Sequence, residues 1–287
     1  MLAGNIPVQK PSIIVVLGAL AAAAAAQPAS AQGKLEAHYT VRLAGLPIGK
    51  GTWVVNIGDT SFTAVVNGAT SGLLKVITDG RGSSSARGTL QNGRPVVSTY
   101  TASIKTSKKS DDVTMTVAEG QAKDIKLEPP LEPSPDRVEV TDAHRTGILD
   151  PMAAAIVRVP GEAPVLGAEA CNRSVAVFDG RLRYDLKLSF KRMDNVKAAR
   201  GYSGPVVVCE VAFTPVAGFN PNRYAIKYIT NQRAMEVWLA PIAGTRVMVP
   251  FRFESPTPVG AAVLEATEFV TTASAASVGG ATKSVKN

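Results

Sequence analysis

The segment RLRYDLKLSFK, residues 181–191, decides the fold of this chain. Every second side chain in it is apolar, namely Leu182, Tyr184, Leu186, Leu188 and Phe190. The side chains between them are polar or charged. Because successive side chains of a β-strand point to opposite faces, this period of two predicts a strand with one buried and one solvent-facing side.

The same alternation recurs in segments 53–57, 96–104, 113–117, 224–228, 235–239 and 247–253. The segment PVVVCEVAF, residues 205–213, is apolar on both faces over most of its length, as expected of a central strand. Short turns with glycine, such as Asp179-Gly180, separate these segments. Roughly a dozen strands at this spacing predict an all-β fold: a strongly curved antiparallel sheet or half-open β-barrel with one or two short helices.

The clearest helix signal is DPMAAAIV, residues 150–157. Asp150 is suited to cap the free N–H groups, and Pro151 fits the first helical position. Residues 70–78 are a second candidate for a turn or short helix. The proline-rich segment 128–136 cannot join a central ladder, so we expect an extended edge segment or a crossover within one domain. A linker between two domains is the alternative.

The N-terminus has the features of an export signal. Lys10 precedes the apolar residues 12–26, and the small residues Ala29 and Ala31 occupy the −3 and −1 positions of a cleavage site. We therefore predict a signal peptide over residues 1–31, cleaved between Ala31 and Gln32, and a periplasmic location. An uncleaved anchor helix is the alternative. The remainder divides into a single all-β domain, residues 32–270, and a disordered tail rich in small residues, 271–287.

Export changes which partners the positive net charge predicts. The formal net charge is +8, and the predicted signal peptide removes one lysine from it. Outside the cytoplasm this favours anionic envelope surfaces such as lipid headgroups, not nucleic acid. The densest cluster, Lys105, Lys108 and Lys109, lies beside Asp111 and Asp112 and is typical of a turn between strands. Aromatic residues, 6% of the chain, are too few for the two girdles of an outer-membrane barrel, so we expect at most a peripheral membrane association.

The chain has two cysteines, Cys171 and Cys209. An even pair in an exported protein predicts a disulfide. The alternative is a metal or redox pair, but the spacing is not that of a C-x-x-C unit, and only His38 and His144 could assist. We expect no metal and no cofactor.

The sequence contains few residues of the types that catalyse reactions near neutral pH. Of the two histidines, His38 falls in the first predicted strand, and His144 lies in a loop beside Asp142 and Arg145. None of the common hydrolase, metalloprotease or nucleotide-binding motifs occurs. We therefore expect a protein that is not an enzyme.

A candidate polar or ligand site can still be named from the sequence. It consists of Asp179, Arg181 and Arg183 at the start of the strongest strand, together with His144. Arginines at a sheet end are suited to a carboxylate or phosphate. The alternatives are a hairpin with salt-bridged arginines and a histidine that only pins its loop.

Three landmarks of the sequence point to a known family. They are VFDGRLRYDL at 177–186, LDPM at 149–152 and GYSGPVVVC at 201–209. Over about residues 34–270 the chain resembles the exported bacterial proteins called domain of unknown function 3108, most closely their proteobacterial branch. The resemblance implies an exported all-β protein with no settled biochemical activity, and it supplies no catalytic residues. By shape, such proteins look like curved-sheet lipid carriers, which is an analogy of fold alone.

Two functions remain open at this point. The first is non-enzymatic binding of a lipid or other amphipathic envelope ligand. The second is an envelope scaffold or assembly factor that contacts partner proteins through a sheet edge or through residues 128–137. Abundant small residues and few aromatics predict an underfilled interior. An apolar cavity of at least about 300 Å³ would favour the carrier, whereas a packed interior would favour the scaffold.

Overall fold

The computed structural model describes residues 32–72, 75, 79–92, 94–231 and 235–274. Within these residues fifteen strands form one sheet. The first half of the chain is a meander in which each strand pairs antiparallel with the one before it. Its strands are β1 (Gln32–Leu43), β2 (Leu46–Ile57), β3 (Ser61–Thr70), β4 (Arg81–Gln91), β5 (Arg94–Lys105), β6 (Ser110–Ala118) and β7 (Gln121–Glu128).

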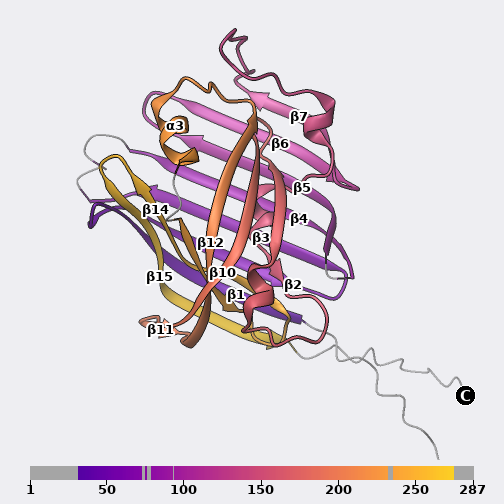
Figure 1. The fold of residues 1–287 in the computed structure, drawn as a ribbon, viewed down its shortest axis with the longest axis vertical. Helices are drawn as coiled ribbons and strands as arrows, with labels where there is room; N and C mark the ends of the chain where they lie inside the picture. Colours follow the sequence, from indigo (N-terminus) through magenta and orange to yellow (C-terminus); the bar gives the residue numbers. More distant parts are fainter. Residues whose placement is uncertain (1–31, 73–74, 76–78, 93, 232–234, 275–287) are drawn as a thin grey trace, which may run out of the picture.

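The second half continues the same sheet from the other side of β1. The last strand of the chain pairs with the first, so the order from there is β15 (Gly260–Ser274), β14 (Val247–Thr257), β13 (Glu236–Pro241), β12 (Ser203–Ala217), β10 (Arg183–Lys197) and β9 (Arg173–Phe178). Two short strands lie off this path: β8 (Val157–Arg158) pairs with β14, and β11 (Arg200–Gly201) pairs with β15. In Figure 1, β10 and β12 cross in front of the β1–β7 layer.

The two edge strands, β7 and β9, face a seam that only a short segment bridges. The Ile148 N–H donates to the Gly120 carbonyl beside β7 at 2.9 Å. The next residue, Leu149, exchanges hydrogen bonds with Ala176 and Phe178 of β9. The sheet is therefore a nearly closed antiparallel barrel, which confirms the predicted fold class.

The main core fills the space between the two layers. Among its fully buried side chains are Phe62, Phe251, Phe269, Leu35 and Met115. The layers approach so closely at Gly33 that an added Cβ would lie 2.6 Å from the Ala243 carbonyl oxygen. The prediction of an underfilled interior does not describe this region, because the few aromatic residues are concentrated inside it.

A second, outer core lies on the opposite face of β12. Val206 and Val208 of this strand belong to the main core, whereas Val207, Cys209 and Val211 belong to the outer one. Residues 157–171 cover this outer face, and a disulfide joins Cys171 to Cys209. The predicted disulfide and the predicted central strand at 205–213 are both confirmed.

The predicted helix at 150–157 is confirmed in its first turn. Helix α2 (Pro151–Ala154) begins after Asp150, whose carboxylate accepts hydrogen bonds from the Met152 and Ala153 N–H groups. The proline-rich segment leads into a crossover, because Val138 pairs through its backbone with Phe219 and Gly218 near the end of β12.

Two boundaries differ from the sequence-based expectations. Residues 224–228 are not a strand but part of helix α3 (Tyr224–Thr230), because YAIKYIT also has a helical period. Tyr224 and Tyr228 stack one turn apart, and Ile229 packs on the outer core. The prediction of a disordered tail is wrong for Thr271–Ser274, which continue β15 and pair with β1.

Several sequence-based assignments fall on residues outside the described part of the chain. They are the signal peptide through Ala31, most of the helix candidate at 70–78 and the tail from residue 275. Gln32, on the mature side of the predicted cleavage site, is the first residue of β1. A search of the described residues finds no helix long and apolar enough to span a membrane.

Candidate functional site

A groove of about 520 Å³ lies along the seam, between β7 and the turn that joins β9 to β10. The segment that follows β7 forms its remaining wall. The groove is lined by Ala122, Lys123, Asp124, Ile125, Leu127, Pro130, Leu131, Val140, Arg145, Phe178, Gly180 and Arg181.

An irregularity in β7 gives the groove its apolar side. The pairing of β6 with β7 shifts between Thr114 and Thr116, and Asp124 adopts a left-handed backbone conformation with φ of 52°. The extra residue changes the alternation of the strand. As a result Ala122 and Leu127, an odd number of positions apart, both line the groove beside the buried Phe178.

The groove carries more positive than negative charge, with Lys123, Arg145 and Arg181 against Asp124. The guanidinium of Arg181 pairs with Asp111 at 3.5 Å and donates to the Pro129 carbonyl at 3.4 Å. Arg145 contacts Asp142 at 3.3 Å through Nη1, while its buried Nε has no hydrogen-bond partner among the described residues. Each arginine thus has a carboxylate partner, and the Nε of Arg145 is a donor left for an anionic group.

The β9–β10 turn is held rigidly against the opposite layer. The Asp179 carboxylate accepts hydrogen bonds from the Arg181 N–H at 2.8 Å and the Leu182 N–H at 2.6 Å. Burial raises the pKa of Asp179 even though these bonds favour its charged form. Gly180 has φ of 94°, and an added Cβ would lie 2.5 Å from Val113 Cγ1. The turn thus sets the backbone position of Arg181.

The structure separates the residues of the predicted polar site. Arg181 lines the groove, and Asp179 shapes its turn. Arg183 pairs with Asp185 at 2.8 Å and does not line the groove. His144 accepts a hydrogen bond from the Thr141 N–H at 3.1 Å in a 3₁₀ turn, Asp142–Arg145, so it pins its loop.

The groove also contains Lys123 and Arg145, which were not predicted as site residues from the sequence. Lys123, Arg145 and Arg181 are far apart in the sequence and converge only because β7 and β9 are the two edges of the sheet. No local motif marks such a site.

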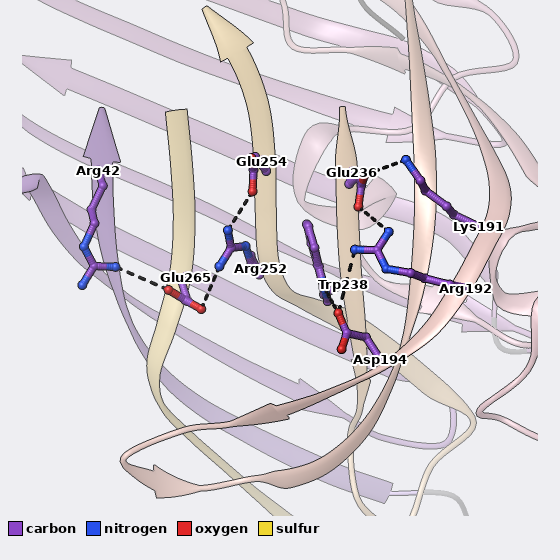
Figure 2. Close-up of polar contacts among 9 residues, drawn as sticks. All are labelled: Arg42, Lys191, Arg192, Asp194, Glu236, Trp238, Arg252, Glu254 and Glu265. Carbon is purple, nitrogen blue, oxygen red and sulfur yellow. Dashed lines mark hydrogen bonds and ion pairs between the residues drawn. The ribbon is translucent and has the colours of Figure 1, made fainter. Parts of the chain in front are cut away.

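A second polar cluster runs across five strands of the sheet (Figure 2). Four cations alternate with four carboxylates in it: Arg42, Lys191, Arg192 and Arg252 with Asp194, Glu236, Glu254 and Glu265. Arg252 bridges Glu265 of β15 and Glu254 of β14, at 3.2 Å and 2.7 Å. Arg42 of β1 also reaches Glu265, at 3.4 Å. On the β10 side, Lys191 and Arg192 both hold Glu236 of β13.

Trp238 links the two halves of this charged ladder. Its ring lies between the guanidinium groups of Arg252 and Arg192, with 5.0 Å and 5.4 Å to the ring centroid. Its Nε1–H donates to Asp194 at 3.0 Å, and this bond lowers the pKa of that carboxyl. Burial alone would raise the pKa of Glu236, but Lys191 and Arg192 hold it below its ordinary value. Because its charges balance, the ladder fastens strands together and leaves no excess charge for a ligand.

Among the described residues, no group of three histidine, cysteine or acidic side chains is placed to bind an ion. The seam groove is the candidate site that the geometry supports best.

Comparisons with known proteins agree with this architecture. A solved structure titled "Crystal Structure of Beta-barrel-like Protein of Domain of Unknown Function DUF1849 from Brucella abortus" is similar over 84% of this chain and 98% of that chain. The TM-score is 0.53 and the sequence identity 10%, so the likeness is one of fold. No curated protein matches the chain. A family model described as "Protein of unknown function (DUF3108)" matches residues 38–267, most of the chain, which therefore belongs to that family.

Proposed function

We propose that this protein is exported to the periplasm and binds one anionic amphipathic ligand, such as a lipid, in the seam groove. It does so without catalysing a reaction. The apolar part of the ligand lies along Ile125, Leu127 and Phe178, and its anionic group lies at Arg181 or Arg145. The observation that carries this proposal is the groove itself, which combines an apolar side with three cationic side chains, Lys123, Arg145 and Arg181.

The size and chemistry of the groove support a ligand of this class. Ligand sites typically measure about 300–1,000 Å³ and are mostly apolar with a few polar groups. At about 520 Å³ the groove falls within this range. The unpartnered Nε of Arg145 is a buried donor that an anion would satisfy, and leaving such a donor unpaired is costly.

The packed main core counts toward the scaffold alternative. The groove at the seam counts toward the carrier, and the scaffold alternative fits the edge strand less well. Partner proteins that add a strand require a straight edge with free backbone groups. β7 instead has an irregular pairing at Asp124 and the charged residues Lys123, Lys126 and Glu128. These are devices by which sheets discourage edge-to-edge pairing. The edge is therefore better suited to line a groove than to accept a strand.

Neither histidine provides a general base in the groove. His38 lies within β1, and His144 is bonded to Thr141. Neither is among the residues that line the groove. This supports a binding function over a catalytic one.

The proposal can be tested by native mass spectrometry of gently purified mature protein, followed by titration of delipidated protein with cis-parinaric acid. We expect a co-purifying mass and a fluorescent complex of one probe per chain. Arg181→Gln should weaken probe binding about tenfold, because one charge-assisted contact is lost. Ile125→Trp should abolish it by filling the groove.

The matched control is Arg183→Gln, at the first residue of β10 and outside the groove lining. It should bind the probe like the native protein. A protein that is consistently empty and does not bind the probe would contradict the proposal. So would an equal loss of binding in the control.

A further inference from the structure

One edge of the sheet gathers the turns that join β1 to β2, β5 to β6 and β14 to β15, together with the end of β3 and the start of β4. Alternating strand directions bring these turns to the same edge, at the left of Figure 1. The Ala44 N–H donates to the Ala261 carbonyl at 2.9 Å, and Ser71 donates to Ile48 at 2.9 Å. An added Cβ on Gly80 would contact Thr106 at 3.9 Å. We call the described residues 44–46, 104–109 and 258–259 the turn edge.

The turn edge collects the most exposed large hydrophobic side chains of the described chain. Leu46, Ile104 and Val259 are 61%, 59% and 67% exposed. The only comparable side chain among the described residues is Tyr224 of α3, at 67%, and this helix lies on the same side of the molecule in Figure 1. Elsewhere in the described chain no large hydrophobic is more than 45% exposed. Apolar tips concentrated at one edge indicate an interaction surface.

The same edge carries three exposed lysines. Lys105, Lys108 and Lys109 are exposed, and none of them forms an ion pair within the described residues. The Thr106 hydroxyl accepts hydrogen bonds from the Lys108 and Lys109 N–H groups, which fixes the turn that presents these lysines.

Nearby carboxylates are largely engaged. Asp79 pairs with Arg81, and Asp111 pairs with Arg181. The pKa of Asp112 is lowered by hydrogen bonds from Ser103 and Ser110 and by the charge of Lys105. The lysines of the turn edge therefore remain available to an external anion.

We propose that the turn edge docks onto the surface of an anionic phospholipid bilayer. Leu46, Ile104 and Val259 enter the boundary between headgroups and acyl chains, and the three lysines contact lipid phosphates. Apolar tips combined with basic side chains are the features by which proteins bind membranes peripherally. This docking is separate from ligand binding in the seam groove and does not depend on it.

The first test is co-sedimentation of the mature protein with vesicles of phosphatidylcholine, with and without phosphatidylglycerol. We expect binding only to the anionic vesicles, and weaker binding at high salt. The triple variant Lys105→Gln, Lys108→Gln, Lys109→Gln should lose at least about tenfold in apparent affinity. The matched control is Arg94→Gln, Lys187→Gln, Lys197→Gln, which removes the same charge from exposed positions elsewhere and should bind nearly as the native protein does.

The second test reports the depth of insertion. Val259→Trp places a fluorophore on the turn edge, whereas Val97→Trp places one near the opposite ends of the strands. We expect lipids brominated on their acyl chains to quench only the first. The native Trp53 and Trp238 are buried, at 6% and 7% exposure, and should contribute little quenching.

Equal binding to neutral and anionic vesicles, equal losses in both triple variants, or equal quenching at both valines would overturn the proposal. Ile125→Trp separates it from ligand binding, because a blocked groove should leave vesicle binding intact. Loss of vesicle binding in that variant would show that the groove, not the turn edge, holds the lipid.

Discussion

The two faces of β12 pack into two cores that are held together in different ways. One face contributes Val206 and Val208 to the main core, which draws residues from Leu35 in β1 to Phe269 in β15. The other contributes Val207, Cys209 and Val211 to the outer core, all of whose fully buried members lie between Val157 and Met248. The main core thus joins both ends of the described chain, whereas the outer core is assembled from its second half.

The covers of the two cores differ in kind. The main core is enclosed by two layers of long, hydrogen-bonded strands. The outer core is covered by residues 157–171, of which only Val157 and Arg158 form a strand. Arg246 helps to hold this cover, donating to the carbonyls of Val159 and Ala163 at 3.2 Å and 2.6 Å. Because this cover forms few backbone hydrogen bonds to strands, it depends on such side-chain contacts and on the disulfide. The disulfide limits the conformations of the unfolded chain.

The sharpest test of this difference is a matched pair, Leu35→Ala in the main core and Leu239→Ala in the outer core. Both leucines are almost fully buried. We expect Leu35→Ala to cost about 4 kcal/mol and Leu239→Ala about 2–3 kcal/mol in the free energy of unfolding, because the segment over Leu239 can collapse onto the cavity. Urea unfolding would measure both values. A larger cost at Leu239 would show that the outer core is the more rigid.

Removing the Cys171–Cys209 disulfide should destabilise the outer core selectively. The double variant Cys171→Ala, Cys209→Ala should lose about 2–4 kcal/mol in the free energy of unfolding. Amide hydrogen exchange should accelerate first in residues 159–170, while β1–β7 remain protected. The native protein after reduction is the control and should behave alike. Uniform acceleration across both layers would contradict two separable cores.

A smaller effect on stability concerns the buried carboxyl group of Asp150. Asp150 is fully buried, receives a hydrogen bond from the Ser98 hydroxyl at 2.5 Å, and burial raises its pKa. A raised pKa in the folded state means that its contribution to stability is present at low pH and is lost as the pH rises through that pKa. Asp150→Asn keeps the helix cap and removes the titration. The variant should therefore gain stability relative to the native protein from pH 4 to pH 7, as measured by thermal unfolding.

The control is the same substitution at a half-exposed site on β6, Asp112→Asn. The pKa of Asp112 is lowered, chiefly by a hydrogen bond from Ser103. Its contribution is present above the ordinary carboxyl pKa and is lost as the pH falls. The two variants should therefore change the slope of stability against pH in opposite directions. Slopes of the same sign would refute the assignment of Asp150 as a carboxyl disfavoured in its charged form.

Much of the fold could be predicted because strands leave a strong periodic signal. Residues 205–213 form the predicted central strand. Residues 183–191 form a strand, but its predicted buried face is only half-buried, and Phe190 is 45% exposed. The error at 224–228 arose because the short segment YAIKYIT, residues 224–230, fits both a period of two and a helical period. The prediction of disorder was wrong for Thr271–Ser274, because backbone pairing with β1, not apolar side chains, holds these residues in β15.

The candidate site was predictable only in part. Arg181 could be predicted as a site residue because an Asp-Gly turn indicates where a strand begins. Arg183, two residues later, has the same chemistry, yet it pairs with Asp185 away from the groove. The sequence contains no signal that distinguishes the two, because the twist of the turn decides which arginine points into the seam.

The amino-acid sequence by itself determined the all-β class, the curved antiparallel sheet, the disulfide and the cap of α2, because each depends on local alternation, on residue type or on a count of cysteines. Only the tertiary structure decided that the interior is packed, that the hollow lies at the seam, and that Lys123, Arg145 and Arg181 share it. The reason is that a barrel which fails to close brings its first and last edges together, and the distance between those edges depends on the twist of every strand between them.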